Sequence, residues 1–256
     1  LTSQLTVPPE LSLVGAFVAR ESGVVCGLPV VEEALRQVDA QVVLRTLHAD
    51  GARVHPGQVL AEAQGNARSL LAAERVALNF LQRLSGIATL TARFVEAVEG
   101  TQARIVDTRK TTPGLRFLEK YAVRCGGGHN HRMGLYDAVM IKDNHIVAAG
   151  GISQAVRAAR AGAPHTVTIT VECDTLNQVE EALAVGVDCI LLDNMTPDSL
   201  RQAVALARGA ALLEASGGVR LENVRAIAET GVDLISVSAL THSAPALDIA
   251  FDLRQP

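Results

Sequence analysis

The chain has 256 residues, of which 48% are hydrophobic, and its formal net charge is -4. A chain of this length can bury a large core in one barrel-sized domain or in two smaller domains. Low aromatic content, no Trp and 21 Gly favour an α/β protein over a stacking platform for nucleic acid. No apolar run approaches the roughly 18 residues of a membrane span, and the N-terminus lacks a signal-peptide pattern. We therefore expect a cytoplasmic protein whose partners include neither membrane nor nucleic acid.

The beginning of the chain predicts a small α+β domain. The turn at residues 51–57, GARVHPG, has no Lys at its tip, which argues against a lipoyl-like or biotinyl-like module. At the other end of the chain, residues 247–253 alternate between apolar and charged side chains, so we predict a half-buried strand that joins the same sheet. The further predicted elements are strands at residues 14–19, 41–47 and 59–63 and a helix at 30–38.

A long helix is predicted next, over residues 69–98. Apolar side chains recur there at spacings of three and four, and Ser69 is placed to cap the start. Glycine inside a helix costs about 1 kcal/mol, so we expect a kink or break at Ser85-Gly86. Arg75 and Arg93 lie on this amphipathic segment, where single charges are normally solvated.

Positive charge is concentrated in residues 107–145, which hold seven of the 23 Lys and Arg and three of the seven His. The cations are interleaved with turn signals, among them the triple glycine at 126–128. Arg109 and Arg132 are of the type that grips planar anions in a fixed fork. We therefore predict a preformed site for a small polyanion carrying carboxylates or phosphates, with an exposed basic loop as the alternative.

The rest of the chain repeats a unit of strand, polar tip, helix and glycine roughly every 20 residues, as in a parallel barrel or doubly wound sheet. Counting strands at 104–106 and 138–141, the repeat predicts six strands. The carboxyl ends of parallel strands lie on one face, and in barrels that face holds the active site. The polar tips include Lys142, Glu172 and Asp193, so we expect cations and carboxylates to converge there.

The tips of the last two strands are small and polar. Ser216, Gly217 and Gly218 follow one strand, and Ser236 and Ser238 end the other. Barrels often bind phosphate at these loops, because free backbone N–H groups and small side chains let an anion approach closely. A tight turn is the structural alternative. Together with the acidic tips, the loops suit a phosphate ester chelated by Mg²⁺, which one or two carboxylates would hold.

Five motifs carry a resemblance to a known family: TRKTTPGLR, CGGGHNHRMGLYDAVMIKDNH, VECDTLNQ, ILLDNM and LEASGGV. From about residue 11 to the C-terminus the chain resembles the quinolinate phosphoribosyltransferases. The resemblance implies a small N-terminal α/β sandwich, residues 1–100 joined by 244–256, and an incomplete, seven-stranded α/β barrel, residues 101–243. It also implies transfer of phosphoribose from phosphoribosyl pyrophosphate to quinolinate with loss of CO₂, which gives nicotinate mononucleotide and pyrophosphate in NAD biosynthesis.

The resemblance further implies roles for individual residues. The implied catalytic residues are Lys110, Lys142, Glu172 and Asp193, of which Glu172 and Asp193 would also hold Mg²⁺. The implied substrate-binding residues are Arg75, Arg109, Lys110, His131, Arg132, Lys142, Glu172, Asp193, Ser216, Gly217, Gly218, Ser236 and Ser238.

The same resemblance implies a homodimer or a higher oligomer, in which Arg75 reaches the site of the partner subunit. Family members usually begin with a helix and a short acidic, glycine-containing stretch that this numbered chain lacks. Because the numbering starts at Leu1 rather than at Met, we expect a leading segment before it.

Other readings of the same residues stay open. Lys142 at a strand end could form a Schiff base, as in barrel lyases. His129-Asn130-His131 has the spacing of a metal-dependent hydrolase, although it follows a glycine loop rather than an early strand. A relative acting on another heterocyclic acid, or a non-catalytic one, would carry similar motifs.

The four cysteines are scattered without C-x-x-C spacing, which predicts neither a disulfide framework nor a zinc knuckle. Cys173 and Cys189 lie in strand-like runs and should be buried. Cys125, beside the triple glycine, is the candidate for a reactive thiol; the fourth cysteine is Cys26.

Overall fold

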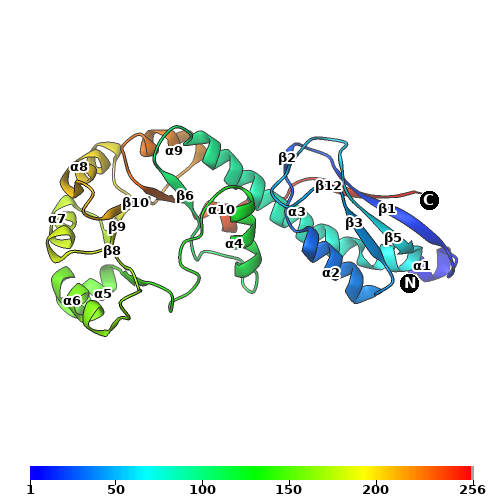
Figure 1. The fold of residues 1–256 in the computed structure, drawn as a ribbon, viewed down its shortest axis with the longest axis horizontal. Coiled ribbons are helices and arrows are strands. Elements are labelled where there is room, and N and C mark those ends of the chain that lie inside the picture. The colour runs from blue at the N-terminus through cyan, green and yellow to red at the C-terminus, as the bar shows by residue number, and fades with distance from the viewer. Residues whose placement is uncertain (255–256) are drawn as a thin grey trace. The chain divides into compact units, whose positions relative to one another are not determined.

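The structure is a computed structural model that describes residues 1–254. The chain forms two compact units (Figure 1). The first holds Leu1–Ala92, Thr112–Gly127 and residues 240–254, and the second holds Arg93–Thr111 and Gly128–Ala239. The sequence had assigned all of residues 101–243 to the barrel, whereas 112–127 belongs to the first unit. Within residues 1–254 no helix is both long and apolar enough to cross a membrane.

The first unit is built on an antiparallel sheet of order β12-β1-β5-β3. The predicted C-terminal strand is confirmed, since β12 pairs antiparallel with β1. The strands of this region are β1 Ser12–Ala19, β2 Gly23–Val24, β3 Val43–Thr46, β4 Arg53–Val54, β5 Val59–Asn66 and β12 Ile249–Arg254. The helices are α1 Thr2–Thr6, α2 Leu28–Val38, α3 Ala67–Ala97, α4 Arg116–Cys125 and α10 Ala239–His242.

One apolar core joins this sheet to its helices. Phe17 from β1, Leu35 from α2, Leu60 from β5 and Leu81 from α3 belong to the same buried cluster. The Phe17 ring also packs at 4.6 Å, centroid to centroid, from the ring of Phe251 on β12. Burying a large apolar side chain stabilises a fold by about 1.5–3 kcal/mol. The core therefore fastens the two ends of the chain together.

The expected break in the long helix is wrong, because α3 runs unbroken for 31 residues through Ser85 and Gly86. The Ser85 hydroxyl accepts from the Cys26 N–H at 2.9 Å and donates to the Cys26 carbonyl at 3.2 Å. A Cβ at Gly86 would collide with the carbonyl oxygen of Pro245. These residues are thus used for close packing against neighbouring backbone, and tertiary contact outweighs the low helix propensity of glycine.

The predicted cap of α3 is also wrong. Asn66, the last residue of β5, accepts through Oδ1 from the N–H of Arg68 at 3.0 Å and of Ser69 at 3.4 Å. An Asn side chain is among the preferred N-caps. The strand therefore leads into the helix without a loop, and Ser69 lies inside the first turn.

The second unit is built on a parallel sheet of order β6-β11-β10-β9-β8-β7, so the α/β prediction and its six strands are confirmed. The resemblance implied seven strands without placing the seventh; besides the six strands, the described residues contain an isolated parallel bridge between Val106 and His129. The strands are β6 Arg104–Val106, β7 Val139–Ile141, β8 Ile169–Cys173, β9 Cys189–Asp193, β10 Leu212–Ser216 and β11 Leu234–Ser236. The helices are α5 Asp143–Ala149, α6 Ile152–Gly162, α7 Leu176–Val185, α8 Pro197–Ala207 and α9 Leu221–Ala228.

The register of this sheet brings the polar strand ends to one edge. Glu172 lies opposite Leu191, and Asp193, two residues further along β9, lies opposite Ser216. Helices follow the strands, and α7 ends at Gly186, whose φ of 74° suits a residue without a Cβ. Charged and hydroxyl side chains from successive repeats therefore share the carboxyl edge, where parallel α/β proteins place their sites.

Candidate active site

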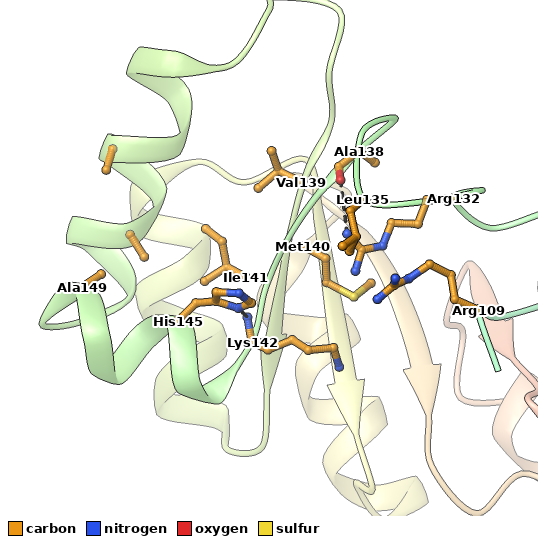
Figure 2. Close-up of a pocket in the computed structure, with 12 residues that line it drawn as sticks. Arg109, Arg132, Leu135, Ala138, Val139, Met140, Ile141, Lys142, His145 and Ala149 are labelled. Atoms are coloured by element: carbon orange, nitrogen blue, oxygen red, sulfur yellow. Dashed lines mark hydrogen bonds between the residues drawn. The ribbon is translucent and has the colours of Figure 1, made fainter.

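An open pocket of about 460 Å³ lies beside the carboxyl end of β7 in the second unit. It brings together three cations that the sequence predicted, Arg109, Arg132 and Lys142. Figure 2 shows the two guanidinium groups facing each other. The Lys142 side chain extends from the strand end, and the Met140 side chain lies between Lys142 and the arginines. The pocket wall is otherwise mostly aliphatic, so the cations supply its polarity.

The two arginines create a strongly positive spot. Burial lowers the pKa of Arg132, and the positive charge of nearby Arg109 lowers it further. Arg132 Nη1 donates to the carbonyl of Ala138 at 3.2 Å, which orients its plane (Figure 2). Like charges held this close repel each other until an anion lies between them. The pair is thus arranged to bind a carboxylate or phosphate.

A buried carboxylate holds the segment that carries Arg132. Asp107, at the end of β6, is fully buried and accepts from the backbone N–H of His131 at 2.8 Å and from Asn130 Nδ2 at 2.6 Å. A buried carboxylate is tolerated when such donors surround it. The sequence had not assigned Asp107 to the site, although an acidic residue directly after an apolar strand is a usable signal.

Glu214 is a second residue that the prediction missed. His131 Nδ1 accepts from the Arg132 N–H at 2.7 Å, so the neutral ring carries its proton on Nε2 and donates it to Glu214 Oε2 at 3.1 Å. Glu214 is 1% exposed, and among residues 1–254 its Oε1 has no hydrogen-bond partner. The hydrogen bond to Glu214 therefore fixes the orientation of the His131 ring. Glu214 lies in β10, and nothing in the sequence spacing links it to His131.

Lys142 and Glu172 form an ion pair between the ends of neighbouring strands β7 and β8. The Lys142 backbone N–H also donates to His145 Nδ1 at 3.0 Å, at the start of α5 (Figure 2). The side chains are 41% and 15% exposed, so the pair remains partly open to solvent. A predicted cation and a predicted carboxylate thus lie in direct contact.

Asp193 and the loop after β10 lie at the next strand ends. Asp193 Oδ2 accepts from Asn194 Nδ2 at 2.6 Å, and the Asn194 N–H donates to the Ser216 carbonyl at 2.9 Å. At Gly217 φ is 91°, and a Cβ there would collide with the Asn194 side chain. Only glycine fits this position. Of the predicted residues only Arg109, Arg132 and Lys142 line the pocket beside β7, and Asp193 lies outside it.

The remaining predicted residues lie in different settings. The buried Ser236 hydroxyl donates to the Ala215 carbonyl at 3.4 Å. Thr108, which the sequence analysis missed, donates to the Ser238 hydroxyl at 3.2 Å and accepts from the Lys110 N–H at 3.1 Å. Thr108 thus ties the loop after β6 to the loop after β11, where the phosphate was predicted.

Two predicted residues contribute less to this geometry. Gly218 follows Gly217 with a φ of 60°, and a Cβ there would meet open space. Arg75 lies on the part of α3 that belongs to the first unit, and its side chain is 67% exposed with Glu74 at 3.6 Å. Its predicted contribution to a partner subunit stays a prediction.

The alternative readings find little support in this geometry. Lys142 is engaged in an ion pair with Glu172, whereas a Schiff base needs a lysine amine free to attack a carbonyl. Both ring nitrogens of His131 are engaged, by Glu214 and by the Arg132 N–H, which leaves neither for a metal. The H-x-H spacing here therefore serves structure.

Together, a parallel α/β sheet with guanidinium, ammonium and carboxylate groups at its strand ends is typical of enzymes that act on small polyanions. Family models give the particular family. Residues 1–85 match the N-terminal domain of quinolinate phosphoribosyl transferase, and residues 87–252 match its C-terminal domain. The chain belongs to the quinolinate phosphoribosyltransferase family, and it is therefore a pentosyltransferase.

Individual relatives agree over nearly the whole length. The chain is 48% identical over 253 residues to a probable carboxylating nicotinate-nucleotide pyrophosphorylase from Bacillus subtilis, covering 99% of this chain and 87% of the relative. It is also 48% identical over 258 residues to the carboxylating nicotinate-nucleotide pyrophosphorylase of Mycobacterium leprae, covering 99% of this chain and 90% of that relative. The crystal structure of NadC from Streptococcus pyogenes superposes with a TM-score of 0.95 at 42% identity, covering 99% of this chain and 90% of that one.

Proposed function

We propose that this enzyme transfers the phosphoribosyl group of phosphoribosyl pyrophosphate to the ring nitrogen of quinolinate and that CO₂ is then lost from C2. The products are nicotinate mononucleotide and pyrophosphate, and the reaction belongs to NAD biosynthesis. The observation that carries the proposal is the pocket in which Arg109, Arg132 and Lys142 converge. The relatives named above have the corresponding activity in their names.

Quinolinate suits this pocket because it carries two carboxylates on adjacent ring carbons. Facing guanidinium groups can each take a carboxylate in a two-point contact, and the aliphatic wall formed by residues such as Val139 and Met140 can cover the ring. Lys142 supplies a further point charge, and His131 is held in one orientation by Glu214. The role of these groups is chiefly to position the acid, because overly strong binding of the carboxylate that leaves would slow its loss.

The phosphoribosyl donor would lie along the later strand ends. Glu172 and Asp193 present carboxylate oxygens at the ends of β8 and β9, the donor type that Mg²⁺ takes from proteins. Bound Mg²⁺ would neutralise charge on the leaving pyrophosphate. Ser216, Gly217 and Gly218, with Ser238, would hold phosphate through hydroxyl and backbone N–H groups.

The carboxylates also explain the first chemical step. When pyrophosphate departs, the ribose becomes cation-like, and the negative charges of Glu172 and Asp193 would stabilise it electrostatically. Lys110 and Lys142 would hold anionic groups of the substrates in place for attack by the ring nitrogen. Ribosylation makes that nitrogen cationic, so it becomes the electron sink that decarboxylation at C2 requires.

The decisive experiment mixes the purified protein with phosphoribosyl pyrophosphate, Mg²⁺ and quinolinate labelled with ¹⁴C in the 2-carboxyl group. We expect one labelled CO₂ for each nicotinate mononucleotide formed. Release of pyrophosphate with another heterocyclic acid, and no labelled CO₂ from quinolinate, would favour the alternative acceptor instead.

A further inference from the structure

Two cysteines that lie far apart in the sequence meet in the first unit. Cys26 precedes Gly27, the N-cap of α2, and Cys125 is the last residue of α4. The two sulfur atoms and a carboxylate oxygen of Asp50 all lie within 4.8 Å of one another. The proposed reaction uses none of these three groups. The sequence singled out Cys125 alone, for its position beside the triple glycine, and no motif links it to Cys26.

The local backbone holds this cluster in place. The Ser85 hydroxyl bonds both the N–H and the carbonyl of Cys26, at 2.9 and 3.2 Å. Asp50 accepts from the N–H groups of Gly27 at 2.9 Å and Leu28 at 3.1 Å, so it anchors the start of α2. At Gly51 φ is 90°, and a Cβ there would lie 3.3 Å from the Cys125 carbonyl oxygen. These backbone contacts thus hold the two thiols next to each other.

The two thiols differ in character. A hydrogen bond from the Cys26 thiol lowers the pKa of Cys125 to about 7; burial opposes this shift, and the neighbouring Tyr121 hydroxyl adds to it. The negative charge of Asp50 and the positive charge of Arg124 act on Cys125 in opposite directions. The same sulfur contact and complete burial raise the pKa of Cys26.

Access distinguishes the two thiols in the same sense. Cys125 is partly exposed, whereas Cys26 is 0% exposed. The thiolate is the reactive form of cysteine, and a sensitive cysteine is an accessible one with a resolving thiol beside it. Cys125 has the accessible position, and Cys26 has the position of the resolving thiol.

We propose that Cys125 and Cys26 form a reversible redox pair that closes to an intramolecular disulfide under a hydroperoxide. The Cys125 thiolate attacks one peroxide oxygen; it loses two electrons, the O–O bond breaks, and sulfenic acid and hydroxide form. The Cys26 sulfur then attacks the sulfur of Cys125, and the sulfenic hydroxyl leaves as water with the proton of Cys26. A dithiol reductant returns the two electrons and restores both thiols.

The arrangement suits a disulfide better than a bound metal ion. Asp50 Oδ1 already accepts one backbone N–H, and Oδ2 accepts another together with the Tyr121 hydroxyl at 2.9 Å. An ion would have to compete with these donors for the carboxylate, whereas a disulfide needs only that the two sulfur atoms, which lie within 4.8 Å, approach to bonding distance.

The test treats the full chain with hydrogen peroxide, alkylates the remaining thiols and maps cross-linked peptides by mass spectrometry. We expect one Cys26 to Cys125 link, reversed by dithiothreitol, while Cys173 and Cys189 stay alkylatable after unfolding. In Cys26→Ser, dimedone should label Cys125, and in Cys125→Ser no link should form. The matched control is Cys173→Ser with Cys189→Ser, which should form the link at the wild-type rate.

Other outcomes would overturn the proposal. If both thiols of the wild-type protein stay reduced under peroxide, the proposal is wrong. It is also wrong if the links join two chains or involve Cys173. Incubation with Zn²⁺ distinguishes a redox pair from a metal site. One tightly held equivalent that protects both thiols, and that is lost in Cys125→Ser, would make the cluster a metal site instead.

Discussion

At the scale of single residues, function depends on charges that the packed chain holds close together. The convergence of Arg109 and Arg132 could be predicted from the sequence, because a basic stretch in an otherwise acidic chain indicates a binding site for an anion. The residues that orient this stretch could not. Asp107 and Glu214 reach His131 across the sheet, and no periodic pattern connects residues so far apart in sequence.

The first prediction concerns the pocket cations. Arg132→Ala and Lys142→Ala should each lower kcat/KM for quinolinate by well over tenfold, a loss of more than about 1.4 kcal/mol of transition-state stabilisation. The control is Arg201→Ala, which removes an exposed ion pair with Asp198 on α8 and should leave kcat/KM unchanged. Steady-state kinetics gives the answer, and near-normal turnover in both pocket variants would remove the basis of the assignment.

The second prediction concerns Glu214 as a positioning residue. Glu214→Ala leaves the Nε2–H of His131 without its acceptor, and an unpaired buried polar group costs about 1–3 kcal/mol. We expect KM for quinolinate to rise with a smaller change in kcat, and Glu214→Gln, which keeps an acceptor oxygen, to recover part of the loss. An unchanged KM in Glu214→Ala, with a lowered melting temperature, would leave Glu214 a purely structural role.

The third prediction is a pH dependence. Because the pKa of Cys125 is lowered to about 7, its alkylation by iodoacetamide should speed up as pH rises, with a midpoint near that value. Cys26→Ser replaces the donating thiol, and Cys26→Ala removes it. The alanine variant should therefore move the midpoint upward, toward the ordinary value for cysteine. An identical midpoint in Cys26→Ala would show that another group sets the reactivity of Cys125.

At the scale of helices and strands, periodicity predicted most elements but not their ends. The repeat of strand, tip and helix in the second unit has one apolar strand per step, so its spacing is visible in the sequence. The predicted break at Ser85-Gly86 and the predicted cap at Ser69 were wrong because contacts with other parts of the chain outweigh local sequence preference. Backbone contacts with Pro245 and Cys26, and the neighbouring strand end at Asn66, decide these positions.

The fourth prediction tests that reason. Alanine normally stabilises a helix relative to glycine by about 1 kcal/mol. Gly86→Ala should nevertheless lower the free energy of unfolding by about 1–3 kcal/mol, because the new methyl group collides with the Pro245 carbonyl. Gly162→Ala, in α6, is the control: its Cβ would meet open space, so stability should stay unchanged or rise slightly. Urea unfolding measures both, and a stabilised Gly86→Ala would refute the packing argument.

At the scale of the whole molecule, the α/β class and the parallel sheet could be predicted because they depend on local alternation of apolar and polar segments. The single bridge that His129 forms with Val106 could not be predicted, since it depends on how the loop after α4 packs against β6. The meeting of Cys26 with Cys125 also depends on packing within the first unit. Such pairs are specified by the fold, and sequence spacing alone contains no record of them.

The fifth prediction concerns the proposed dimer, in which Arg75 serves the site of the partner subunit. Arg75→Ala and Lys142→Ala subunits should each be nearly inactive alone. After unfolding and refolding together in equal amounts, about a quarter of the sites should be intact, because half of the two-fold dimers are mixed and each mixed dimer has one complete site. No recovery of activity, with mixed dimers present by mass spectrometry, would place Arg75 outside the partner's site.

The central claim is that quinolinate lies in the pocket beside β7 with its carboxylates on the two arginines. A crystal structure of the enzyme with quinolinate tests this most directly. We expect the two carboxylates within hydrogen-bond distance of Arg109 and Arg132, with the ring nitrogen facing the ends of β8 and β9. Quinolinate bound elsewhere, or bound in this pocket with its carboxylates away from both guanidinium groups, would contradict the account.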